Sequence, residues 1–99
     1  YSAWHNIVPV NIRKQQKIRY DVVGPLCESA DFLGKDRELA IESGDLLAID
    51  TVGAYGFSMS SHYNSRPKPA EILIDGNKMQ VIRKREQVED LFALENHLA

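Results

Sequence analysis

The chain has 99 residues, of which 43% are hydrophobic, and its formal net charge is −2 at pH 7. This length provides for a single domain over residues 1–99 with a modest core, and it leaves no room for a second domain. The nearly balanced charge does not predict nucleic-acid binding, and no apolar stretch approaches the ~20 residues of a membrane-spanning helix, so neither kind of partner is expected.

The first predicted strand covers residues 17–23. Ile18, Tyr20 and Val22 fall on one side and charged residues alternate with them, as in a half-buried strand. Gly24-Pro25 then ends the strand. A shorter strand is predicted at Leu46–Ile49, where an uninterrupted apolar run indicates burial on both faces.

A hairpin follows in the second half of the chain. Residues 71–74 and 78–82 are predicted to be its strands, and Asp75-Gly76-Asn77 between them tolerates the positive φ that a tight turn requires. A short helical turn is predicted upstream, at residues 57–61.

The last predicted element is a C-terminal helix. Val88, Leu91 and Phe92 fall on helical spacing, and acidic residues occupy the first turns, where the helix dipole favours them. Together, the elements indicate a mainly β domain of about six strands with one C-terminal helix, arranged as a closed or partly open barrel that hides its strand edges.

Cys27 is the single cysteine, so no internal disulfide is possible and a reduced, cytoplasmic setting is expected. A lone cysteine is more often a small buried hydrophobic residue than a reactive group. The adjoining Glu28 favours a functional role, because a carboxylate beside a thiol is not typical of a core. If Glu28 is buried, it needs a cationic partner, which the ammonium group of a substrate could supply.

Gly53-Ala54-Tyr55-Gly56 admits two interpretations. The glycines either permit a sharp turn with a surface tyrosine, or they let a ligand approach the backbone while the Tyr55 phenol makes a hydrogen bond. His5, His62 and His97 lack the paired spacing of a metal site, so no metal is predicted. Neither a nucleotide-binding glycine loop nor a serine-nucleophile motif is present in the sequence.

Several short motifs occur in a fixed order along the chain. They are Tyr1-Ser2-Ala3-Trp4-His5, Gly24 through Ser29, Lys35-Asp36-Arg37, Gly44-Asp45-Leu46-Leu47, Gly53 through Phe57 and Pro69-Ala70-Glu71. In this combination the sequence resembles the C-terminal part of the diaminopimelate decarboxylase family. The family has an N-terminal (β/α)8 barrel that holds pyridoxal 5'-phosphate and a C-terminal β domain, a barrel or sandwich similar to that of alanine racemase.

The chain resembles only the second of these domains. It also begins without methionine, so we expect a fragment of a larger two-domain enzyme from which the N-terminal barrel is absent. The family's cofactor-binding lysine lies in that barrel, and the fragment alone is therefore expected to be inactive. The family's Cys-Glu-Ser-Gly-Asp motif is Cys27-Glu28-Ser29-Ala30-Asp31 in this chain, and Ala30 suits the loop if its φ is negative.

The resemblance implies a pyridoxal-phosphate-dependent decarboxylase that converts meso-2,6-diaminopimelate to L-lysine and carbon dioxide, the last step of lysine biosynthesis. In the resembling enzymes the active site forms at a homodimer interface, and Cys27 would be the proton donor that reaches into the partner's site. Glu28 would bind the distal amino group of the substrate and Tyr1 its distal carboxylate. Tyr55 would contact both the cofactor and the substrate.

Alternatives to this function remain open. An ornithine, lysine or arginine decarboxylase of the same fold would keep the cofactor and Cys27. Glu28 and Tyr1 favour diaminopimelate, because those relatives carry Cys-Asp and their substrates lack a distal carboxylate. A non-catalytic β module for dimerisation is the alternative from another class, and a redox role for Cys27 is disfavoured because the chain has no second thiol.

Overall fold

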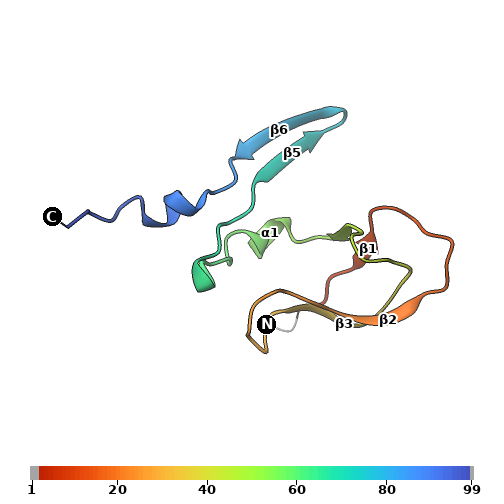
Figure 1. Ribbon diagram of the computed structural model, residues 1–99. Coiled ribbons are helices and arrows are strands. Elements are labelled where there is room, and N and C mark those ends of the chain that lie inside the picture. The colour runs from red at the N-terminus through yellow and green to blue at the C-terminus, as the bar shows by residue number, and fades with distance from the viewer. Residues whose placement is uncertain (1–2, 99) are drawn as a thin grey trace. The chain divides into compact units, whose positions relative to one another are not determined.

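The computed structural model describes residues 3–98, and the chain divides into two compact units, Tyr1–Phe57 and Ser58–Ala99. The prediction of a single domain over residues 1–99 stays a prediction. The described residues are mainly β with little helix (Figure 1). Their elements in chain order are β1 (Ile7–Pro9), β2 (Ile18–Val23), β3 (Phe32–Leu39), β4 (Leu47–Ile49), α1 (Gly53–Gly56), the 3-10 helix η1 (Tyr63–Ser65), β5 (Glu71–Asp75), β6 (Lys78–Arg83) and the 3-10 helix η2 (Val88–Phe92).

The first unit contains two antiparallel strand pairs. β1 pairs with β4, so that Ile7 lies opposite Ile49, and β2 pairs with β3, so that Ile18 lies opposite Leu39. β1 also lies against β3. The buried hydrophobic residues among those described are Ile7, Leu39 and Ala40, and all of them belong to this unit. The small core therefore holds β1 against the C-terminal end of β3.

The predicted strand at residues 17–23 is confirmed as β2, which ends immediately before Gly24. Its partner β3 was not predicted. Between the pairs Tyr20–Arg37 and Val22–Gly34 the register shifts, so β3 advances three residues while β2 advances two. Such a bulge breaks the alternation of apolar and polar residues by which a strand is identified in a sequence.

The strand predicted at Leu46–Ile49 is present as β4, but its burial on both faces was wrong. Leu46 precedes the strand and is exposed, and the three strand residues are only half-buried. β4 has one partner strand in this unit, β1, and a pair of strands cannot cover both of its own faces.

The hairpin prediction in the second unit is confirmed. β5 and β6 pair with Asp75 opposite Lys78, which leaves Gly76 and Asn77 as a two-residue turn (Figure 1). Gly76 has a φ of 61°, in the region that a residue with a side chain rarely adopts. Every residue of β6 is exposed.

The predicted C-terminal helix is present only as η2. The side chains of Gln87 and Asp90 form a reciprocal cap at its start, and the backbone N–H of Ala93 then bonds to the carbonyl of Asp90, three residues earlier. Val88 and Phe92 are exposed, so no buried apolar face stabilises a full α-helix.

The helical turn predicted at residues 57–61 was also wrong, because residues 57–59 form turns and the helical assignment falls on α1 instead.

Within residues 3–98 the six strands form three two-stranded sheets and no closed barrel. In that part of the chain no helix has the length and apolar character that crossing a membrane requires.

Candidate functional site

The loop that carries Cys27 joins β2 to β3 and is closed by its own backbone. The N–H of Gly24 donates to the carbonyl of Asp31 at 2.8 Å, and the N–H of Leu26 donates to the Asp31 carboxylate at 2.8 Å. A third bond runs from the N–H of Asp31 to the carbonyl of Glu28, at 3.0 Å. A side chain on Gly24 would collide with the Asp31 carboxylate. Glycine is therefore the residue that lets the two ends of this loop meet.

Cys27 lies at the exposed part of this loop as a free thiol. A small buried hydrophobic residue, the more common role of a lone cysteine, is thus not its role in this unit. The bonds made by Gly24, Leu26 and Asp31 fix the backbone on either side of it. The thiol is consequently held in place by the loop while it stays accessible.

Glu28 is exposed rather than buried, so its charge stays hydrated and needs no cationic partner to offset a cost of desolvation. One of its carboxylate oxygens accepts hydrogen bonds from the N–H of Ala30 at 3.2 Å and from the hydroxyl of Ser29 at 3.4 Å. No ion pair involves Glu28 among residues 3–98. Ala30 is not among the positive-φ residues of the described chain, which meets the condition for alanine at this position. The carboxylate is oriented locally and keeps its charge available.

Tyr55 is carried by a turn and not by a regular helix. Within α1, Ala54 has φ −75° and ψ 130°, and Tyr55 has φ 69° and ψ −19°. These angles are those of a type II turn, whose third position normally requires glycine or asparagine. The N–H of Gly56 donates to the carbonyl of Val52, the residue before this turn, at 3.0 Å. The side chain of Tyr55 is 72% exposed, so the strained backbone presents the phenol to solvent.

Of the predicted site residues, the structure brings Cys27 and Glu28 together on one loop. Tyr55 lies on a separate segment of the same unit, and within the described residues no hydrogen bond joins it to either of them. Tyr1 lies outside the described residues. In residues 3–98 no cluster of three or more histidine, cysteine, aspartate or glutamate side chains is suited to a metal ion.

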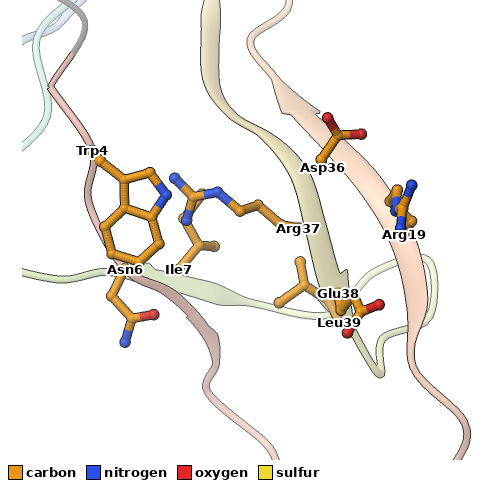
Figure 2. Close-up of a pocket in the computed structure, with 8 residues that line it drawn as sticks. All are labelled: Trp4, Asn6, Ile7, Arg19, Asp36, Arg37, Glu38 and Leu39. Carbon is orange, nitrogen blue, oxygen red and sulfur yellow. The ribbon is translucent and has the colours of Figure 1, made fainter.

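A pocket of about 550 Å³ opens elsewhere on the first unit (Figure 2). It is lined by residues before and in β1 and by residues of β2 and β3: Trp4, Asn6, Ile7, Arg19, Asp36, Arg37, Glu38 and Leu39. Cys27, Glu28 and Tyr55 do not line it. Figure 2 shows the Arg37 side chain extending from β3 toward Trp4, with Ile7 beside it.

Arg37 connects β3 to the segment that precedes β1. Its guanidinium carbon lies 4.3 Å from the centroid of the Trp4 ring, and its Nη1 donates to the carbonyl of His5 at 2.7 Å. A side chain on Gly34 would lie 2.8 Å from Ile7 and 2.9 Å from Arg37, so glycine leaves room for both. The buried Nε of Arg37 has no hydrogen-bond partner in the described chain.

The bulge in β3 directs Arg37 to this position. Asp36 has a φ of 54°, and its N–H donates to the side chain of Asp21 at 3.0 Å. Aspartate tolerates this left-handed backbone better than most residues because its short polar side chain bonds locally.

The same N-terminal segment also bonds to the end of β4. The ring Nδ1 of His5 donates to the carbonyl of Asp50 at 3.2 Å, and the N–H of Asp50 donates to the carbonyl of Asn6 at 2.9 Å. The side-chain amide of Asn6 adds a bond to the Asp50 carboxylate at 3.2 Å. His5, Arg37 and Asp50 were not predicted to belong to the site. His5 and Arg37 could have been identified as candidates because they lie inside the motifs that occur in a fixed order along the chain.

An ion pair fixes the start of β4. Arg13 donates two hydrogen bonds to the Asp45 carboxylate, each at 2.7 Å, and lies 3.3 Å from Glu42. The Arg13 hydrogen bond, and then that from the N–H of Glu42, lower the pKa of Asp45 to about 2. The same hydrogen bond to Asp45 raises the pKa of Arg13.

Glu86 joins two segments of the second unit through hydrogen bonds to its side chain. Its carboxylate accepts hydrogen bonds from the N–H of Lys68 at 2.6 Å and from the ring of His62 at 2.7 Å. These bonds, that of Lys68 first, lower the pKa of Glu86. They hold the extended segment before β5 against the segment that follows β6.

Comparison with known proteins identifies relatives over almost the whole chain. Residues 1–53 match the family described as pyridoxal-dependent decarboxylase, C-terminal sheet domain. The diaminopimelate decarboxylase of Vibrio cholerae is 53% identical over 98 residues, which are 99% of this chain and 24% of that protein.

Two solved structures are similar in both sequence and fold. The diaminopimelate decarboxylase of M. jannaschii in co-complex with L-lysine superposes with a TM-score of 0.92 at 41% identity, covering 99% of this chain and 23% of that one. The Helicobacter pylori enzyme complexed with L-lysine gives a TM-score of 0.86 at 50% identity, covering 96% and 24%. The chain thus spans about a quarter of the length of the relatives it matches.

Proposed function

The chain belongs to the pyridoxal-dependent decarboxylase family, as its C-terminal sheet domain, and from this membership we propose that it is the C-terminal part of a diaminopimelate decarboxylase. The proposed reaction converts meso-2,6-diaminopimelate to L-lysine and carbon dioxide. The observation that carries the proposal is the 53% identity to a curated diaminopimelate decarboxylase over 98 residues. Solved relatives that hold L-lysine, the product of this reaction, support it further.

Cys27 is the proposed proton donor. Its thiol is exposed on a loop that backbone hydrogen bonds hold in place, which is what a group that delivers a proton to a substrate carbon requires. The bound pyridoxal 5'-phosphate supplies an electron sink for the bond that breaks when carbon dioxide leaves. The Sγ proton of Cys27 then passes to the carbon that has lost its carboxylate, and the thiolate regains a proton from solvent.

Glu28 is the proposed ligand of the distal ammonium group of the substrate. Its carboxylate is exposed and oriented by Ala30 and Ser29, and no cation of residues 3–98 neutralises it. Tyr1 is proposed to bind the distal carboxylate. A substrate with a positive and a negative group at its far end would satisfy both side chains, which favours diaminopimelate over ornithine, lysine or arginine.

Tyr55 is the proposed contact of this chain with the cofactor and the substrate. Its phenol is exposed, and within residues 3–98 no atom outside the local backbone and the two neighbours of Gly53 lies within 4 Å of the place where a Cβ on Gly53 would be. This open space beside the turn fits a planar group that approaches the backbone.

The cofactor-binding lysine is proposed to come from an N-terminal (β/α)8 barrel of the full-length protein, to which this chain adds a β domain similar to that of alanine racemase.

The proposed assembly is a cytoplasmic homodimer with shared active sites. Cys27 and Glu28 are exposed in this chain, whereas proton delivery to a carbon centre is favoured where water is excluded. A partner subunit that closes over the loop would provide that environment and would place Cys27 in the partner's site.

The experiment that tests the proposal measures carbon dioxide release by the full-length protein with pyridoxal phosphate. Meso-diaminopimelate, lysine, ornithine and arginine are offered separately. We expect a strong preference for diaminopimelate. Preference for lysine, ornithine or arginine would show that the proposed substrate is wrong and that the proposed decarboxylation is right. Inactivity on all four compounds would favour a non-catalytic dimerisation module.

A further inference from the structure

The turn that presents Tyr55 is held by a chain of contacts that begins far from it in sequence. We define the Asp50 junction as Trp4, His5, Asn6, Arg37 and Asp50. His5 is its centre, because its ring donates to the carbonyl of Asp50 at 3.2 Å while its own carbonyl accepts from Arg37 at 2.7 Å. Asp50 is thereby tied, through His5, to β3.

The backbone that follows Asp50 is strained. Thr51 has a φ of 61° and Tyr55 a φ of 69°, although both residues carry a Cβ and Thr51 is β-branched. Such conformations persist only where the surrounding structure imposes them, and they concentrate at functional sites. The hydrogen bonds of the Asp50 junction end at the residue immediately before Thr51, so they fix the point from which the strained turn departs.

On these observations we propose that His5 is a positioning residue for Tyr55, acting through the carbonyl of Asp50. The proposal rests on the proposed function only in that Tyr55 is taken to contact the substrate. Donation to a carbonyl requires the proton on Nδ1, so the contact depends on a donor at that place and not on the ring as a whole. An asparagine amide at position 5 can place a donor near the site of Nδ1, and leucine of similar size cannot.

The first test compares His5→Leu, His5→Asn and Tyr55→Phe in the full-length enzyme. We expect His5→Leu to raise the KM for meso-diaminopimelate about fivefold, the size of one lost hydrogen bond, with a smaller change in kcat. His5→Asn should restore a KM near that of the parent. In the Tyr55→Phe background, His5→Leu should add less than about twofold, because both changes then remove the same contact.

The matched control is Arg13→Gln. It breaks the ion pair with Asp45, which lies in the same unit but outside the Asp50 junction, and should leave KM unchanged. If His5→Leu lowers affinity equally in the presence and absence of the Tyr55 hydroxyl, or if His5→Asn is as impaired as His5→Leu, the proposal is wrong.

A second measurement does not depend on activity. Amide hydrogen exchange at residues 51–56 should accelerate in His5→Leu and not in His5→Asn, because the Asp50 carbonyl loses its donor only in the first. Unchanged exchange in His5→Leu would overturn the inference even if the enzyme were active. Should His5→Leu fail to fold, His5→Ala replaces it in the comparison: exchange at residues 51–56 should be faster in His5→Ala than in His5→Asn, and equal exchange in the two variants would overturn the inference.

Discussion

The carboxylate of Asp31 occupies the space in which a side chain on Gly24 would have to lie. The two residues also share a backbone hydrogen bond of 2.8 Å, so the loop of Cys27 and Glu28 closes at a single point. The position of the thiol thus depends on a contact between two residues that have no chemical role of their own.

Gly24→Ala should therefore damage the enzyme through the loop. The added methyl group displaces the Asp31 carboxylate, which then loses its bond to the N–H of Leu26. Because misplacing a reacting group by about 1 Å can cost about 100-fold in rate, we expect kcat to fall by about tenfold to 100-fold. Steady-state kinetics measure this change. Gly76→Ala, at the hairpin tip, is the matched control: it should lower thermal stability without lowering kcat, and equal kinetic losses in both variants would refute the explanation.

Cys27→Ala should abolish most of the turnover without unfolding the protein. Removal of a positioned proton donor typically costs about 10²–10⁴-fold in rate, whereas loss of an exposed side chain leaves packing intact. We expect Cys27→Ser, a weaker acid, to retain intermediate activity. Carbon dioxide release and the thermal midpoint are measured on the same samples. Near-normal turnover in Cys27→Ala would remove the thiol from the mechanism.

Glu28→Gln should weaken recognition of the distal ammonium group alone. Glutamine can keep the acceptor oxygen that Ala30 and Ser29 use, so the loop is preserved and only the charge is lost. We expect kcat/KM for meso-diaminopimelate to fall by about tenfold to 100-fold, as for loss of a charge-assisted hydrogen bond.

The substrate analogue 2-aminopimelate provides the decisive comparison for Glu28. It lacks the distal ammonium group, so the parent and Glu28→Gln should process it alike. Glu95→Gln, an exposed change near the C-terminus, should leave kcat/KM for both compounds unaltered. A loss of equal size for both compounds in Glu28→Gln would indicate damage to the loop instead.

The ion pair of Arg13 with Asp45 predicts a pH-dependent contribution to stability. The pKa of Asp45 is lowered to about 2 in the folded chain, whereas the pKa of an aspartate in an unfolded chain is about 4. The folded state therefore releases this proton more readily, so the contribution is complete above about pH 4 and is lost as the pH falls toward about 2. Protonation of Asp45 therefore lowers the stability of the folded state only at acidic pH.

Arg13→Gln should accordingly lower the thermal midpoint by a few degrees at neutral pH. The difference from the parent should shrink as the pH falls through this window, and it should persist at alkaline pH because the pKa of Arg13 is raised. Differential scanning calorimetry from neutral pH to the lowest pH at which both proteins fold provides the measurement. Arg19→Gln, whose guanidinium makes no ion pair among residues 3–98, is the control. A difference that stays constant with pH would exclude the ion pair as its source.

The parts of the fold that were predictable are those in which local sequence and local structure agree. β2 alternates apolar and polar residues, and the hairpin has a glycine where its turn needs positive φ. β3 was missed because two register shifts and the left-handed Asp36 interrupt its pattern. The C-terminal helix was overestimated because helical spacing does not reveal whether a buried surface exists to stabilise it.

In the candidate site, too, the residues that belong to local motifs could be predicted, whereas the contacts between distant parts of the chain could not. Cys27, Glu28 and Tyr55 were named from their motifs, and their roles stay predictions. The contacts of His5 with Asp50 and of Arg37 with His5 join residues 45 and 32 positions apart, which no local pattern can indicate. They depend on β1 lying against β3 and pairing with β4, and that arrangement is visible only in three dimensions.

Trp4 is the single tryptophan of these 99 residues, and it stacks on the guanidinium of Arg37. A cation held 4.3 Å from the ring centroid lies close enough to shift the emission of the indole. Any event that separates β3 from the N-terminal segment would move that cation away. The chain therefore contains its own fluorescent reporter, placed where the support of Tyr55 begins, and the coupling between the two could be followed in real time without attaching a dye.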